Sequence, residues 1–210
     1  MVGATTLGGR SVKEQFIDIY KTSIDRHGAD KFLAWLSATD FFTAPASTRY
    51  HLSREGGLAE HSLNVYYRLR RLVEEETGGD FDEATEEHVA LVALLHDVCK
   101  ANYYGVEMRN RKNEAGIWEK VPFYIVNDQL PFGHGEKSVY LINQCMPLTA
   151  EEAMAIRWHM GYSDNDFKAG GQSVSNAFGK YPLAVLLHVA DLMASHIDEV
   201  EEDMEDKNNG

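Results

Sequence analysis

Cysteine and long apolar runs are both scarce in this sequence. Among 210 residues only two are cysteine, Cys99 and Cys145, which is too few for a disulfide framework, so we expect a protein of the reducing cytoplasm. The longest apolar stretch, 183–190, is interrupted by His188 and is much shorter than the ~20 residues that cross a membrane. Residues 1–10 lack the basic and then apolar pattern of a secretory signal. We therefore expect neither a membrane segment nor a signal peptide.

Positive charge is also in short supply. The chain has 20 Lys and Arg against 33 Asp and Glu, a formal net charge of −13, which argues against a long nucleic acid as partner. Seven of the carboxylates fall in 198–206, so we expect a solvated acidic tail over 198–210. The remaining composition, 44% hydrophobic and 25% charged, is that of an ordinary globular protein. The length predicts one domain, at 11–197, preceded by a flexible arm at 1–10.

Hydrophobic spacing and capping residues predict a mostly helical domain. Capping boxes of the form Ser/Thr-x-x-Glu begin two helices, at Ser11 and at Thr149. Further helices are expected from an Asp30 cap, at 58–77, at 84–100, after Gly133 and from Pro182 to about Glu199. Residues 103–126 have the β-branched and aromatic character of a β-hairpin, and the Gly-rich segment 161–179 is expected to be a loop. The expected fold class is therefore all-α, a helical bundle with one small β-hairpin insertion.

The side chains that point to a chemistry are histidine and aspartate. His96 and Asp97 close the apolar helix expected at 84–100, and helical spacing puts other such side chains on apolar helix faces. A buried aspartate without a partner costs several kcal/mol, and a shared pair of divalent cations removes this penalty. Imidazole and carboxylate suit Fe, Mn, Ni, Co or Zn. For each residue alone, a hydrogen-bonded core side chain is the better explanation. The set together predicts a metal site made of His61, His96, Asp97, His134, His159 and Asp191.

The order of these residues resembles the HD-domain superfamily of metal-dependent phosphohydrolases. Residues 56–62, Gly-Gly-Leu-Ala-Glu-His-Ser, look like the family's Gly-Gly-Leu-x-x-His-Ser, and 96–100 look like its His-Asp-x-Gly-Lys with Cys99 in place of glycine. The resemblance covers roughly residues 45–196 and implies an HD-type helical bundle. His134 and His159 are what the two-metal branch of the superfamily adds to the four-ligand branch, so the resemblance implies two divalent ions.

The resemblance also implies roles for individual residues. Asp97 and Lys100 are the expected catalytic residues, Asp97 as the bridge between the two ions. The other implied ligands are His61, His96 and Asp191 for one ion and His134 and His159 for the other. The implied reaction is hydrolysis of a phosphate ester by metal-bound hydroxide. The implied substrate is a nucleotide or another small phosphorylated metabolite.

Four side chains near the motif need an interpretation of their own. Lys100 either donates to a phosphate oxygen or complements a helix C-terminus. Arg109, on the expected hairpin, either binds a phosphate or belongs to a solvated strand face. Tyr162 follows His159 closely, and this position makes it a candidate substrate contact. Cys99 is expected to be a small core residue rather than a catalytic thiol.

A different chemistry uses the same order of ligands. Mixed-valent di-iron oxygenases, similar to myo-inositol oxygenase, have this six-ligand pattern, and residues 132–136 and 156–159 have some resemblance to the matching parts of that enzyme. Because nitrogen and oxygen ligands take iron or manganese with similar ease, ligand identity does not separate a hydrolase from an oxygenase. A non-catalytic module of the same fold is a third hypothesis. Such a module would be expected to have lost ligands, whereas all six are present.

Overall fold

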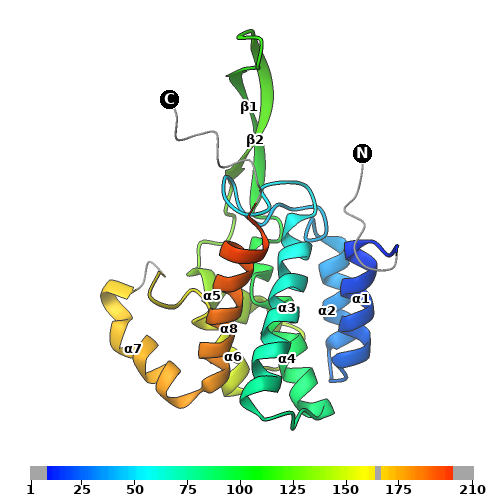
Figure 1. Ribbon diagram of the computed structural model, residues 1–210, viewed down its shortest axis with the longest axis vertical. Helices are drawn as coiled ribbons and strands as arrows, with labels where there is room; N and C mark the ends of the chain where they lie inside the picture. Colours follow the sequence, from blue (N-terminus) through cyan, green and yellow to red (C-terminus); the bar gives the residue numbers. More distant parts are fainter. Residues whose placement is uncertain (1–8, 164–166, 201–210) are drawn as a thin grey trace.

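Helices form the body of the molecule, and a two-stranded hairpin rises from one end of it (Figure 1). The computed structural model describes residues 9–163 and 167–200. The helices are α1 (Val12–Ser23), α2 (Ala29–Ala38), α3 (Gly57–Glu76), α4 (Glu83–Leu95), α5 (His134–Asn143), α6 (Ala150–Arg157), α7 (Phe167–Lys180) and α8 (Pro182–Met193). Short turns η1 (Val98–Lys100) and η2 (Gly161–Ser163) follow α4 and α6, and a π-helical turn η3 (Ala194–Asp198) continues α8. The expected all-α class with one hairpin is confirmed.

The core is built around α4, in which every residue from Val89 to Leu95 is buried. A helix that is apolar all round must be covered on all sides. The helices α1, α3 and α6 pack against it, and α3 packs in addition against α8. The His96-Asp97 pair follows α4 directly, so the chain leaves its most buried helix at the pair and both side chains lie inside the body.

The hairpin has the expected position. It consists of β1 (Tyr104–Lys112) and β2 (Trp118–Val126), which are antiparallel with Tyr104 opposite Val126 and Lys112 opposite Trp118. Gly116 takes a left-handed conformation in the connecting turn, with φ of 76°. At the base, the Tyr104 hydroxyl donates a hydrogen bond of 3.1 Å to the carbonyl of Ala46. This bond ties the hairpin to the loop that precedes α3.

Two helix boundaries differ from the sequence prediction. The helix expected at 84–100 ends at Leu95, because Asp97 turns out of the helical conformation with ψ of 17°. The start of α2 is capped by Gly28 in the left-handed region, with φ of 90°, and not by Asp30. A Cβ at Gly28 would lie 1.9 Å from the carbonyl oxygen of Cys145, so close backbone packing decides this cap.

The prediction of a loop at 161–179 is also wrong, since most of this segment forms helix α7. Its residues Val174, Ala177 and Phe178 have helical spacing and contact Trp158, so tertiary packing overrides the glycines of this segment. Among the described residues, no single helix is long and apolar enough to cross a membrane. Only 172–180 and 182–198 taken together, across a bend of 107°, reach the required length and composition.

The two expected termini lie mostly outside the described residues, namely at 1–8 and 201–210. The first two residues of the predicted acidic tail, Asp198 and Glu199, contact the body of the protein and are not a solvated end. Asp198 pairs with Arg68 of α3, and Glu199 is only 5% exposed. The helical domain therefore extends at least to Glu199.

A buried carboxylate fixes the start of α6. Glu152 is fully buried and accepts two hydrogen bonds of 2.9 Å from the guanidinium of Arg26 and one of 2.7 Å from His88 Nδ1. It also accepts from the backbone N–H of Thr149, which completes the expected capping box. Arg26 lies between α1 and α2, and His88 lies in α4. Glu152 thus joins three parts of the chain at the helix that leads to His159.

We expect Glu152→Gln to lower the free energy of unfolding by about 2–3 kcal/mol, because Arg26 loses the second oxygen of its anionic partner. The matched control is Glu151→Gln at the exposed neighbouring position, with an expected change within about 0.5 kcal/mol. Urea denaturation of the three proteins measures both values. Equal effects of the two substitutions would contradict the assigned role of Glu152.

Candidate metal centre

Asp97 lies in the middle of four imidazoles, and its two oxygens face different pairs of them. The Oδ2 atom is 3.7 Å from His61 Nε2 and 3.6 Å from His96 Nε2. The Oδ1 atom is 2.7 Å from His134 Nε2 and 3.6 Å from His159 Nε2. One carboxylate therefore stands between two pairs of imidazoles, here called the Oδ2 half-site (His61 and His96) and the Oδ1 half-site (His134 and His159).

The half-site on the Oδ2 side contains a second carboxylate. Asp191 of α8 places its Oδ1 atom 3.2 Å from His61 Nε2, and the Nε2 atoms of His61 and His96 are also 3.2 Å apart. These side chains come from α8, from α3 and from the residue that caps the end of α4. The structure thus brings together all six side chains that the sequence analysis selected.

Backbone carbonyls hold two of the histidines from behind. His96 Nδ1 lies 2.8 Å from the carbonyl of Ala93, and His159 Nδ1 lies 2.7 Å from the carbonyl of Ile156. Because a carbonyl only accepts hydrogen bonds, Nδ1 must carry the proton in both rings. The lone pair of each ring is then on Nε2, which faces the cluster, and this is the arrangement of a metal-ligating histidine.

One of these lone pairs has no partner. His159 Nε2 is buried and makes no hydrogen bond to any described residue. Leaving a buried polar atom unsatisfied costs about 1–3 kcal/mol. A divalent cation beside Asp97 would satisfy the His159 lone pair and neutralise the carboxylate, so the residues present fit a bound metal.

The pKa values describe the competition between protons and a cation at this site. Burial alone lowers the pKa of His61, but the hydrogen bonds that its ring donates to Asp191 and Glu199 outweigh it and raise the pKa to about 10. Burial lowers the pKa of His96 to about 3. For Asp97, burial raises the pKa, but Lys100 and the imidazoles hold it well below its usual range. A proton on His61 therefore occupies the position that a cation would take.

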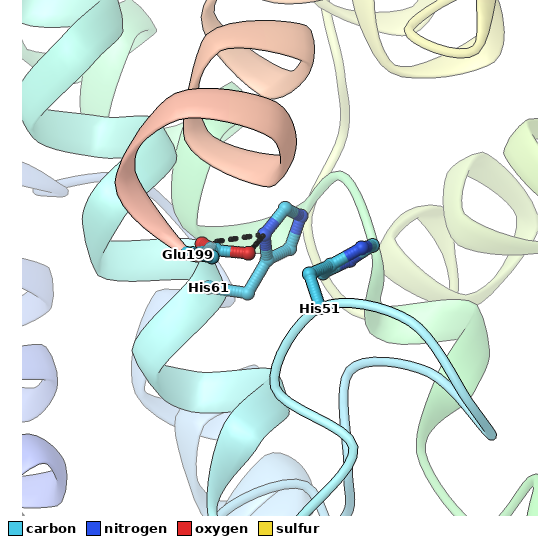
Figure 2. A group of neighbouring side chains, drawn as sticks. All are labelled: His51, His61 and Glu199. Carbon is cyan, nitrogen blue, oxygen red and sulfur yellow. Dashed lines mark hydrogen bonds and ion pairs between the residues drawn. The ribbon is translucent and has the colours of Figure 1, made fainter. Parts of the chain in front are cut away.

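Glu199 is a functional residue that the sequence analysis placed wrongly, in the solvated tail. Its two oxygens lie 3.0 and 3.1 Å from His61 Nδ1, and Figure 2 shows the carboxylate beside the ring, with His51 on another side. The Asn64 amide donates to Glu199 at 2.9 Å. Glu199 thus orients His61 so that Nε2 points to the cluster. One signal in the sequence was available: Glu199 lies eight residues after Asp191, a spacing that keeps it on the same face of a helix. The surrounding acidic residues at 198–206 made Glu199 look like part of a solvated tail.

Two glycines of the Gly-Gly-Leu motif let a loop approach the start of α3. Gly56 caps the helix in the left-handed region, with φ of 76°. A Cβ at Gly57 would lie 2.1 Å from the carbonyl oxygen of Leu52. The same loop carries His51, whose ring centroid is 5.0 Å from that of His61. The glycines are therefore needed to place His51 over the site.

A third glycine brings the second half-site together. A Cβ at Gly135 would lie 2.2 Å from the carbonyl oxygen of Arg157, so the backbones of α5 and α6 touch at this point. His134 and His159 flank the contact, and their ring centroids are 5.2 Å apart. A side chain at position 135 would force the two histidines apart.

The predicted substrate contacts fall in different places. Lys100 lies at the cluster, with Nζ 2.6 Å from Asp97 Oδ2. Arg109 does not reach it, because it lies roughly 17 Å along β1 from Tyr104 and pairs with Glu107 on the hairpin. The Tyr162 hydroxyl shares a hydrogen bond of 2.9 Å with Ser175 of α7. Of the three, only Lys100 contacts a side chain of the cluster in a described interaction.

Metal-stripped protein should lose stability as the pH rises from about 6.5 to 9. The pKa of His61 in the folded protein is about 10 and lies above the ordinary histidine value of 6.5, so the stabilisation is complete below pH 6.5 and disappears as the pH approaches 10. The measurement is Tm against pH after treatment with a chelator. Asp191→Asn removes a main cause of the raised pKa and should flatten the curve. A wild-type Tm that increases across this range would contradict the assignment.

Comparison with known proteins gives one family. The model of the HD domain family matches residues 58–201, well over half of the chain. Among curated proteins and among solved structures, none gives a significant match. The matched span contains the whole ligand cluster, from His61 to Asp191, with the His96-Asp97 pair at its centre. The chain therefore belongs to the HD-domain superfamily of metal-dependent hydrolases, whose members bind divalent ions.

Proposed function

We propose that this protein is a dinuclear metal-dependent phosphohydrolase of the reducing cytoplasm. Its substrate is a phosphate ester, namely a nucleotide or another small phosphorylated metabolite. One observation carries the proposal: the two oxygens of Asp97 face separate pairs of imidazole Nε2 atoms, which is the placement of a carboxylate that bridges two ions. Four imidazoles and two carboxylates form a ligand set suited to Fe, Mn, Ni, Co or Zn.

The bound cations supply a water nucleophile of lowered pKa and neutralise charge on a phosphoryl oxygen. The chain's own residues do the remaining work. Asp97 separates the half-sites, and Glu199 holds His61 in the ligating orientation from behind. Lys100 keeps Asp97 ionised and adds a positive charge beside the ligands, where an anionic substrate would bind. No serine or cysteine nucleophile is required.

Charge supports a small substrate over a polynucleotide. The formal net charge of −13 repels an extended phosphate backbone, whereas the ligand cluster offers a local cation at Lys100. Arg109 of β1 does not add to this cation. Arg109 is engaged by Glu107 on the hairpin and lies over the ring of Phe123, at 5.5 Å from its centroid.

The metal content of the purified protein should be two equivalents per chain. His159→Ala should reduce it to one, because the Oδ1 half-site loses a ligand while the Oδ2 half-site keeps all of its side chains. His27→Ala, at an exposed histidine outside the cluster, is the control and should retain two. Elemental analysis after dialysis gives the stoichiometry. Two equivalents in the His159 variant would exclude this residue as a ligand.

The reaction is tested by incubating metal-loaded protein with a panel of phosphate esters and a panel of polyols in air. We expect release of phosphate, or of a shortened phosphate ester, without consumption of O₂. Asp97→Asn should reduce the rate by more than the roughly 10–100-fold seen when a partner that orients a ligand is lost. Stoichiometric O₂ uptake with a polyol would instead support the di-iron oxygenase, which shares this ligand order.

A further inference from the structure

Cys99 occupies the position at which the HD motif has glycine, and it projects a sulfur atom into the ligand cluster. Its Sγ atom lies 3.4 Å from His134 Nδ1 and 3.7 Å from His134 Nε2. It also lies 4.0 Å from Asp97 Oδ1, the oxygen that faces the second half-site. The side chain is only 2% exposed. The sulfur therefore belongs to the cluster and is not in the solvent.

We propose that the Cys99 thiolate is a direct ligand of the ion held by Asp97, His134 and His159. This inference rests on the proposed function, since it assigns a further ligand to the same dinuclear site. On binding, the sulfur–metal bond forms as the S–H bond breaks, and the proton leaves to solvent. The ion in this half-site then has a sulfur ligand, which the ion beside His61, His96 and Asp191 lacks.

The sulfur lies within reach of an ion that Asp97 and His134 could share. In a tetrahedral zinc site, with Zn–S of about 2.3 Å and Zn–N of about 2.0 Å, the sulfur and nitrogen ligand atoms are roughly 3.5 Å apart. The observed separation between Cys99 Sγ and His134 Nε2 is 3.7 Å. The ligand atoms of Asp97, Cys99 and His134 all lie within 4.8 Å of one another. The sulfur is nearer to Nδ1 than to Nε2, so it lies beside the His134 ring, and the ring or the Cys99 side chain must rotate for one cation to contact all three.

A second observation points to a ligand in the same place. His159 Nε2 is buried, has no hydrogen-bond partner among the described residues, and lies 3.6 Å from the same Asp97 Oδ1 atom. Its lone pair and the Cys99 sulfur thus converge on one carboxylate oxygen. An ion bound at this oxygen would lie close to both side chains.

The surroundings of Cys99 differ from those of an ordinary core cysteine. Its sulfur lies 3.4 Å from an imidazole nitrogen and 4.0 Å from a carboxylate oxygen, and its backbone N–H donates to the hydroxyl of Ser138 at 3.1 Å. Cys99 does not have the positive φ for which glycine is favoured, so cysteine is accommodated here without backbone strain. The consequence is a preference of this half-site for Zn or Co over Mn or Mg, because thiolate is a soft ligand.

The test is a spectroscopic titration of the metal-stripped full-length protein with Co²⁺. Wild-type protein should develop a thiolate-to-cobalt charge-transfer band in the near ultraviolet, in addition to the visible d–d bands, as the second half-site fills. Cys99→Ser and Cys99→Ala should lose the charge-transfer band. They should also bind one of the two equivalents at least about 10-fold more weakly. Loss of a residue that merely orients a ligand already weakens metal binding by about this factor, and loss of a direct ligand should cost no less. Cys145→Ala removes the other cysteine and should keep the band.

The possible outcomes separate the two proposals. Visible d–d bands without a charge-transfer band in wild-type protein would overturn the role of Cys99 and leave the metal site intact. A band that survives in folded Cys99→Ala but disappears in Cys145→Ala would overturn it as well. If wild-type protein binds no cobalt, both the thiolate ligand and the dinuclear site are refuted. Because the decisive spectrum is that of the wild type, the test does not depend on the folding of a variant.

Discussion

The buried negative charge of Asp97 is the constraint on which the rest of the structure depends. It follows α4, whose residues Val89–Leu95 are all buried, and its side chain is itself only 2% exposed. A carboxylate in this position is tolerated only if positive groups surround it. Lys100 supplies one such group, and four imidazoles face the two oxygens. The opposed pairs of imidazoles explain why one residue can organise two half-sites.

The body of the protein holds three of the candidate ligand histidines in place from behind. The carbonyls of Ala93 and Ile156 fix the rings of His96 and His159, and Glu199 fixes the ring of His61. Each of these contacts uses Nδ1 and leaves Nε2 for the cluster. The fixed orientations reduce the reorganisation needed on metal binding, which is the usual purpose of such contacts in metal sites.

Helix starts, the hairpin and the six clustered side chains could be predicted because each has a local signal. A capping box at Thr149, helical spacing around His61 and the composition of 103–126 all act over a few residues. Helix α7 and Glu199 were missed for the opposite reason. The glycines of α7 disfavour a helix locally, and packing of Val174 and Ala177 against Trp158 helps to stabilise it. An acidic run hid the single carboxylate that folds back onto His61.

Local patterns alone predicted the helical class and selected the six clustered His and Asp side chains, because residue type and spacing can be read from the chain, and the resemblance of these residues to the HD motif pointed to the family. Tertiary structure decided which atoms meet. It gave each oxygen of Asp97 its own pair of imidazoles, turned Glu199 inward, and brought the sulfur of Cys99 to His134. Apart from the adjacent pair His96 and Asp97, these contacts join residues from 35 to 138 positions apart along the chain. No pattern with the period of a helix or strand can encode them, because they depend on how whole elements pack.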